Sequence, residues 1–564
     1  MSTDQMRPIL FIALAFVGFL LWQAWQKDYG PRPEAPASQP VAGSGAERSE
    51  DGGPSVATAP GPDVPAVPEP TAIAGSTAGA GDAPSTAAGV KADGIDVVTD
   101  VYRARILLKG GTLAAVDLLE YPVSTEEPDR PFPLLVESGS KLFVAQSGLV
   151  GKTSAPNHHA VYSAAKDTYR LEPGSDELRV DLVWEDGGIE VTKSYTFRRG
   201  SYEIDVTHHV RNNSNEPWAG RVYGQFRRAA PNESRGLGQI YTYNGGVISS
   251  PEKPYEKYDF DDMADQDLSQ DIVGGWAAMI QHYFAGAWIP AKDVEAHYYS
   301  KALTSSQYTF GVVEPGFSIA PGTSGSAGLK LFVGPKIQRF LEAAAPGLER
   351  TVDYGWLFFI AQPLYIGLQW IQSVVGNWGW SIIFLTVLIK LAFFPLSNAS
   401  YKSMARMRKL QPKIMSLKDR YGSDRQKLNQ AMMEMYKKEK INPLGGCLPI
   451  VVQIPVFIAL YWVLLETVEL RQADFMFWLD DLSTHDPFYV LPILMGISMF
   501  VQQRLSPAPP DPIQAKVMMA MPIVFTFFFL FFPSGLVLYW LCNNLLSIAQ
   551  QWYITRRIEA GTMK

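Results

Sequence analysis

Cysteine is almost absent from this chain of 564 residues, which contains only Cys447 and Cys542, both within apolar stretches. This scarcity excludes a secreted fold stabilised by several disulfide bonds, and it excludes a zinc site whose ligands are cysteines. An excess of basic residues is also lacking, since the formal net charge is −7. The chain is therefore not a generally basic nucleic-acid binder, and we expect no DNA partner.

Catalytic signatures are lacking as well. We find no Ser/His/Asp triad, no paired carboxylates and no phosphate-binding loop, so we predict neither an enzyme nor a cofactor. The seven histidines include two adjacent pairs, His158-His159 and His208-His209. Neighbouring side chains on a strand point to opposite faces, so we do not expect either pair to share an ion, and we predict no metal site.

A signal-peptidase site is missing after the first apolar run. That run extends from Ile9 to Trp25, follows Arg7, and ends in Trp22 and Trp25 with no A-x-A-like sequence behind it. Tryptophans suit the membrane interface. We predict that residues 1–29 form an uncleaved signal anchor with a span at about 8–26. A cleaved signal peptide is the alternative.

Large apolar side chains are scarce in residues 30–92, which are rich in Pro, Ala and Gly and should form a disordered tether. From residue 93 to 335 the pattern changes to period two. Val180, Leu182 and Trp184 alternate with polar residues, and Gly and Pro separate many such short runs. This pattern predicts a large antiparallel β-sandwich.

The last third of the chain is apolar. The region 336–375 is interrupted by Gln362, Pro363, Gln369 and Gln372, which favours an amphipathic helix lying in the membrane interface. The region 376–555 is predicted to be a core of five spans. We place these spans at about 376–396, 444–465, 488–503, 517–532 and 536–554.

Charged loops set the orientation of these spans. The segment 398–442 carries twelve Lys and Arg residues against four Asp and Glu, a net +8, and should stay in the cytoplasm. The loop 466–486 has six acidic residues against Arg471 alone and should lie outside. Five spans then place both termini in the cytoplasm and the β-domain outside the membrane, whereas a sixth span would put the β-domain in the cytoplasm.

Lys390 is the most informative residue of the predicted core. It lies six residues before the cytoplasmic end of its span, about 9 Å deep at 1.5 Å per residue. The spans contain no acidic residue to neutralise it, so we predict a wet, positively charged groove open to the cytoplasm. The alternatives are a lysine that snorkels to the interface and polar side chains that only bond between helices. The polar residues that could accompany it include Ser381, Thr386, Gln453, Asn543, Asn544 and Ser547.

The basic segment 398–442 has helical periodicity. Leu410, Ile414, Leu417 and Tyr421 recur at helical spacing before a break at Gly422, which predicts two antiparallel helices of about 20 residues each. Its methionines suit either promiscuous apolar ligands or an ordinary core. Its basic face suits lipid headgroups, ribosomal RNA or plain solvation. The candidate contact residues are Met404, Met407, Arg408, Met432 and Met435.

Several longer stretches resemble the YidC-type family of membrane protein insertases, in the form found in Gram-negative bacteria. They are GNWGWSIIFLTVLIKLAFFPL (376–396), YKSMARMRKLQPKI (401–414), NPLGGCLPIVVQIPVFIALY (442–461), VELRQADF (468–475), LPILMG (491–496), FFPSGLVLYWLCNNLLSIAQQ (531–551) and, in the β-region, GGWAAMIQHYFAGAWIP (274–290). The resemblance covers essentially the whole chain except the tether.

The resemblance implies an inner-membrane protein with five core spans, an interfacial helix and a periplasmic β-supersandwich of the sugar-epimerase type. It implies a positively charged groove residue at Lys390, where arginine is commoner, and a groove threonine at Thr386. Trp540 falls where the family usually has a functional tyrosine, beside Tyr539.

The same resemblance implies the partners. They are nascent membrane proteins, the Sec translocon with its accessory subunits, and membrane lipids. Ribosome binding is expected to be weak, because the basic tail, 556–564, is short. No cofactor is implied.

Two other functions fit parts of the pattern. A secondary transporter would need internal repeats and acidic coupling sites, which we do not find. A membrane-anchored, extracytoplasmic carbohydrate-active protein would need a converging His/Glu pair in the β-region, with His208, His209 and His282 as candidates.

Overall fold

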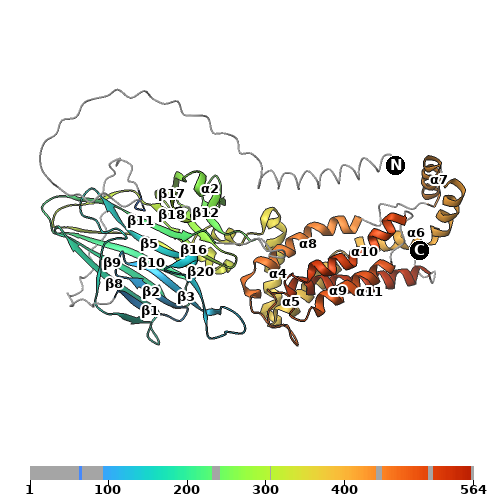
Figure 1. Cartoon of the computed structure of the whole chain (residues 1–564), viewed down its shortest axis with the longest axis horizontal. Helices are drawn as coiled ribbons and strands as arrows, with labels where there is room; N and C mark the ends of the chain where they lie inside the picture. The colour runs from blue at the N-terminus through green and yellow to red at the C-terminus, as the bar shows by residue number, and fades with distance from the viewer. Residues whose placement is uncertain are drawn as a thin grey trace, which may run out of the picture.

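The computed structural model describes residues 63–65, 93–231, 242–304, 306–422, 424–439, 448–505 and 512–559. Its two parts are a strand-rich domain and a bundle of helices, joined end to end (Figure 1). The predicted anchor span at 8–26 and the tether, apart from residues 63–65, lie outside the described residues.

Two sheets form the strand-rich domain, and the β-sandwich prediction is confirmed. The first has eleven strands. In spatial order these are β14 (Ser269–Val273), β17 (Glu295–Thr304), β18 (Gln307–Val313), β11 (Trp218–Ala229), β5 (Phe143–Gly151), β3 (Thr112–Pro122), β2 (Tyr102–Leu107), β1 (Gly94–Val98) and β7 (Thr168–Arg170), with β19 (Phe317–Ile319) beside β11 and β4 (Pro131–Leu135) beside β3.

The second sheet has nine strands. They are β13 (Glu256–Tyr258), β12 (Gly245–Ser249), β15 (Trp276–Ile280), β16 (Phe284–Ile289), β20 (Ser324–Pro335), β10 (Glu203–Asn212), β9 (Ile189–Arg198), β8 (Glu177–Asp186) and β6 (Ser163–Ala164). The period-two residues Val180 and Leu182 are fully buried in the core that both sheets share. Described neighbours pair antiparallel except β1 and β7, a parallel pair at one edge that the sequence did not indicate. The epimerase-type supersandwich stays a prediction.

Helices follow the last strand, after α2 (Phe260–Asp265) within the β-domain. They are α3 (Gln338–Ala344), α4 (Phe358–Val375), α5 (Trp378–Ala392), α6 (Phe394–Tyr421), α7 (Arg425–Lys438), α8 (Leu448–Glu466), α9 (Val490–Leu505), α10 (Pro512–Phe529) and α11 (Ser534–Glu559), with short 3₁₀ turns at Gly139–Lys141, Leu348–Thr351, Gly355–Leu357 and Val468–Leu470. Among the described residues the predicted spans overlap α5, α8, α9, α10 and α11, and the first of them continues into α6.

The first predicted span ends earlier than expected. We placed its end at residue 396, but α5 stops at Ala392 and α6 starts at Phe394 after a bend of 67°. Pro395 lies in the first turn of α6, where its missing N–H does no harm, and it cannot continue α5 because its ring blocks an uninterrupted helix. No single helix among the described residues is long and apolar enough to cross a membrane. The bent pair α5–α6, taken together, meets this criterion by length and composition. The number of spans therefore stays a prediction.

Helix α4 corresponds to the predicted amphipathic helix. Leu368 and Ile371 are buried against the bundle, while Trp370 and Val374 are exposed on the other side. The helix contains Pro363 and ends at Gly376, whose positive φ of 75° suits a glycine. This apolar outer face is what an interfacial helix requires, and its place in the membrane stays a prediction.

A buried ion pair joins the β-domain to the bundle. Lys336, directly after β20, donates from Nζ to Glu466 Oε2 at 2.9 Å and to the Thr351 carbonyl at 3.1 Å. Both partners of the pair are almost fully buried. Arg471 adds a second link by donating to the carbonyl of Pro122 at 2.7 Å. The loop after α8 is therefore fixed to the β-domain.

Candidate functional site

Lys390 lies in a polar cluster inside the helical bundle. Its side chain is buried, with the residue 4% exposed, and its ammonium donates to Ser547 Oγ at 2.8 Å. The Ser547 hydroxyl donates to the Asn543 carbonyl one turn back at 2.7 Å. Gln453 Nε2 lies 3.4 Å from Asn543 Oδ1, a long hydrogen bond. We call these four residues the Lys390 cluster; they connect α5, α8 and α11.

The Lys390 ammonium has no carboxylate partner in the described part of the chain. Among the described residues Lys390 forms no ion pair, as expected from the absence of acidic residues in the predicted spans. An ammonium has three N–H donors, and within the described part of the chain one of them has a hydrogen-bond acceptor. The cluster can therefore offer positive charge and free N–H groups to a polar or acidic ligand.

Thr386 lies one turn before Lys390 on the same face of α5. Its hydroxyl is buried and donates to the Ile382 carbonyl at 2.7 Å, so the oxygen remains available only as an acceptor. Its role in contacting substrate stays a prediction.

Tyr539 and Trp540 lie one turn before Asn543 and belong to an aromatic cluster. The Tyr539 ring stacks on Phe457 of α8 with centroids 5.8 Å apart, and Trp540 meets Phe457 and Phe529 edge-on at 4.3 and 4.8 Å. These contacts connect α8, α10 and α11. The predicted site residues of the bundle therefore lie in two adjoining layers, one polar and one aromatic.

The sequence placed Ser547 and Asn544 among the possible polar neighbours of Lys390 without giving either a specific contact. Ser547 supplies the acceptor for Lys390, and Asn544 donates to Ser498 Oγ at 3.0 Å and joins α11 to α9. The available signal was the spacing of Asn543 and Ser547, four residues apart on one helical face.

The basic hairpin is unequal in its two arms. Helix α6 has 28 residues and α7 has 14, so the expectation of two helices of about 20 residues is wrong. Asp424 ends the turn by capping α7, accepting from the Lys427 amide at 3.1 Å. Arg408 is exposed, and the four candidate methionines are half-buried, which leaves them partly accessible. The candidates are Met404, Met407, Met432 and Met435.

Of the histidines proposed for a carbohydrate-active site, His208 and His282 have no carboxylate partner among the described residues. His208 is fully buried, and neither of its ring nitrogens has a hydrogen-bond partner within the described residues. His282 donates to the Leu465 carbonyl at 3.0 Å, and burial lowers its pKa to about 3. A cleft of about 1060 Å³ beside the nine-stranded sheet has no histidine in its lining. Its lining includes Lys330, which pairs with Glu203 at 3.0 Å. None of this favours a glycosidic or epimerase chemistry.

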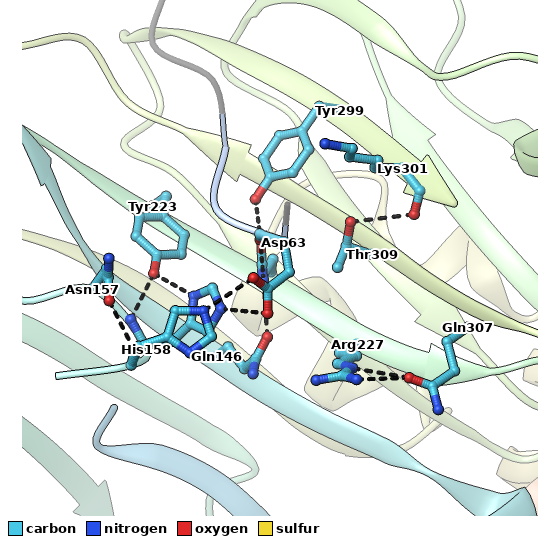
Figure 2. Close-up of polar contacts among 12 residues, drawn as sticks. Asp63, Gln146, Asn157, His158, Tyr223, Arg227, Tyr299, Lys301, Gln307 and Thr309 are labelled. Carbon is cyan, nitrogen blue, oxygen red and sulfur yellow. Dashed lines mark hydrogen bonds and ion pairs between the residues drawn. The ribbon is translucent and has the colours of Figure 1, made fainter. Parts of the chain in front are cut away.

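A different pair of histidines does converge. His158 and His159 both face Asp63, at 3.1 and 3.0 Å, and Figure 2 shows the His158 ring between Asp63 and the Tyr223 hydroxyl. Burial, and secondarily the neighbouring His159, lowers the pKa of His158 to about 4. Burial raises the pKa of Asp63, but the hydrogen bonds from both imidazoles outweigh it and lower the value to about 2. We expected adjacent histidines to point to opposite faces and so not to share an ion; the premise of opposite faces is wrong for this pair, because residues 157–160 form a turn rather than a strand.

Comparison with known proteins decides the family. The model of the YidC periplasmic domain matches residues 94–366, and that of the 60Kd inner membrane protein matches residues 370–561. Proteins called membrane protein insertase YidC are 51% identical in Thioalkalivibrio sulfidiphilus, over all of both chains, and 52% identical in Nitrosococcus oceani, over 99% of each. The one in Methylococcus capsulatus is 51% identical over all of both chains. This chain belongs to the YidC family.

Membership in the YidC family confirms the resemblance drawn from the sequence motifs. It identifies the β-sandwich as the periplasmic domain and the protein as one of the bacterial inner membrane. YidC proteins are insertases and not enzymes, which agrees with the lack of catalytic signatures. The two family matches meet in α4, between residues 366 and 370.

Proposed function

We propose that the chain inserts nascent membrane proteins into the bacterial inner membrane and that the Lys390 cluster contacts the polar flank of the substrate. The main support for this site is the buried Lys390 ammonium, whose only acceptor in the described part of the chain is a hydroxyl oxygen, Ser547 Oγ. A buried cation without a counter-ion is costly unless a wet cavity or a ligand compensates it. The names of relatives about 50% identical over the full chain support the activity.

The proposed topology has one signal anchor and five core spans, with both termini in the cytoplasm. The cytoplasmic face is then marked by the net charge of +8 in residues 398–442, and the periplasmic face by the acidic loop 466–486. The anchor keeps the β-domain at the outer surface of the membrane. In this orientation Lys390 lies between the midplane and the cytoplasmic end of α5.

The proposed mechanism shortens the path of polar peptide through lipid. A hydrophobic substrate segment slides along the lipid-facing side of α9 and α11, where Ile497, Phe500 and Leu545 are exposed. Its polar flank meanwhile rests in a groove near Lys390, Thr386 and Gln453. Each unsatisfied backbone group costs several kcal/mol in lipid, and a hydrated groove avoids part of that cost. The membrane potential contributes about 2 kcal/mol per charge per 100 mV.

The proposed partners follow from this role. Substrates arrive alone or with the Sec translocon and its accessory subunits. The half-buried methionines of the hairpin offer a soft apolar surface to them, while Arg408 and the basic residues around it contact lipid headgroups.

Complementation tests this proposal. In a strain depleted of its own insertase, Lys390→Arg should restore insertion of a small substrate and Lys390→Glu should not, because the glutamate repels an acidic flank. Lys437→Glu is the matched control, since it makes the same charge reversal at an exposed hairpin position and should restore insertion. Full activity of the Lys390→Glu protein, at equal abundance in the membrane, would refute the electrostatic role.

A further inference from the structure

Three residues of the predicted tether lie against the periplasmic domain. The Asp63 carbonyl accepts from Gln225 Nε2 at 3.2 Å, and Val64 is buried with Tyr223 and Tyr299. These contacts are on the face of the eleven-stranded sheet opposite the main core, because Tyr223 and Gln225 alternate along β11 with the core residues Val222 and Phe226. The composition of residues 30–92 did not indicate this attachment.

The Asp63 carboxylate is held between two imidazoles. Asp63 Oδ2 lies 3.1 Å from His158 Nε2, and Oδ1 lies 3.0 Å from His159 Nε2. One potential ligand atom from each of the three residues lies within 4.8 Å of the others. Two metal–ligand bonds of about 2.1 Å whose ends are 3.0 to 3.1 Å apart meet at roughly a right angle, which transition-metal ions accept. Such bonds span at most about 4.2 Å, so two ligand atoms near the 4.8 Å limit would share the ion after a small movement of the exposed His159 side chain.

The turn at residues 157–160 makes this convergence possible. The His159 amide donates to Asn157 Oδ1 at 2.9 Å, and the Ala160 amide donates to the Asn157 carbonyl at 3.1 Å. Because the chain turns here, the two rings do not point to opposite faces; their centroids are 4.2 Å apart. The sequence argument against a shared ion assumed that both histidines lie on a strand, and it does not apply to a turn.

Tyr223 fixes the orientation of the buried ring. Its hydroxyl oxygen lies 2.7 Å from His158 Nδ1 and accepts from the His158 amide at 2.9 Å (Figure 2). This leaves His158 Nε2 directed at Asp63. Metal-binding histidines usually have such a partner on the second ring nitrogen. His159, by contrast, is 43% exposed in its side chain, so the group is open to solvent on one side.

We propose that Asp63, His158 and His159 bind a divalent transition-metal ion of the Zn²⁺ class, with water completing its coordination. Two imidazole nitrogens and one carboxylate form a ligand set typical of zinc. With the ion bound, His158 Nδ1 carries the ring proton and donates it to the Tyr223 oxygen. The ion ties the tether to the periplasmic domain across 95 residues of sequence.

Metal binding to the full-length protein tests the proposal. The protein is purified in detergent without a histidine tag, stripped with a chelator, dialysed against Zn²⁺ and analysed for bound metal. One equivalent is expected, with Co²⁺ giving a d–d absorption spectrum at the same site. Asp63→Asn and His159→Ala should each weaken Zn²⁺ binding about a hundredfold, and Tyr223→Phe should weaken it about tenfold.

A second histidine–carboxylate pair provides the control. His297 Nδ1 lies 2.7 Å from Asp271 Oδ1 on β17 and β14, and within the described part of the chain no third ligand group joins them. His297→Ala should leave the bound metal unchanged. The exposure of His159 means that His159→Ala should also leave the melting temperature of the metal-free protein unchanged, which separates lost ligation from misfolding. Absence of bound metal in the wild type, or unchanged binding in Asp63→Asn and His159→Ala, would overturn the proposal and leave a hydrogen-bonded attachment of the tether.

Discussion

The periplasmic domain and the helical bundle each bury a lysine, and they treat its charge differently. Lys193 on β9 is fully buried, and its ammonium donates to the carbonyls of Gly110, Gly111 and Ser147 at 2.9 to 3.0 Å. Lys390 on α5 is almost as buried, but its ammonium has Ser547 Oγ as its one acceptor within the described residues. The first lysine is saturated with hydrogen bonds, and the second is not.

This difference separates a structural charge from a functional one. An ammonium with three acceptors has no donor left for a ligand. The ring of Tyr195, with its centroid 5.4 Å from Lys193 Nζ, covers the charge further, and burial lowers the pKa of Lys193 well below its usual value. Lys390 retains donor capacity, which is what a site for passing polar peptide needs. Burial alone would not have distinguished the two.

Removing the saturated lysine should have the largest effect on stability. Lys193→Ala removes the ammonium donor from three buried carbonyls, of which the Gly111 carbonyl still accepts from the Tyr195 hydroxyl, and it opens a cavity. We therefore expect the periplasmic domain to lose about 5 kcal/mol of stability. Urea unfolding of the full chain, followed by protease resistance of the β-domain, measures this loss. Lys301→Ala, at an exposed position on β17, is the control and should change stability by less than about 0.5 kcal/mol. A loss for Lys193→Ala below about 2 kcal/mol would contradict the structural role.

Removing Lys336, which joins the β-domain to the bundle, should have an intermediate effect on stability. Lys336→Met leaves Glu466 buried without a partner, and we expect the contact between the two parts to weaken by about 3–5 kcal/mol. The double change Lys336→Met with Glu466→Leu removes both charges and should restore most of that stability, because a buried pair can be replaced by apolar residues at little cost. Thermal unfolding of the two single variants and the double variant in detergent measures the coupling. Equal losses in the single and double variants would mean that the pair does not hold the junction.

The helices of the bundle could be predicted from the sequence because hydropathy is local. The stretch predicted at 488–503 is α9, Val490–Leu505, and the one at 536–554 lies within α11. The break between α5 and α6 was missed, since apolar residues continue through it and only Pro395 signals it. Long-range contacts were harder: Lys390 and Ser547 are 157 residues apart, and no local pattern pairs them. Asp63 was hidden in a region whose composition, taken as a whole, indicates disorder.

The unsaturated lysine should be the easiest of the three to remove without unfolding the protein. In Lys390→Met the side chain keeps similar volume, and Ser547 keeps its own hydrogen bond to the Asn543 carbonyl. We therefore expect a stability change of about 1 kcal/mol or less, the net value of one hydrogen bond. Insertion of substrates with an acidic or polar flank should nevertheless fall, because the cluster loses its positive charge. Comparing the melting temperature in detergent with insertion of such a substrate into membrane vesicles tests both parts. A large drop in melting temperature would mean that Lys390, like Lys193, has a structural role. Unchanged stability together with full insertion of every substrate would contradict the proposed contact site.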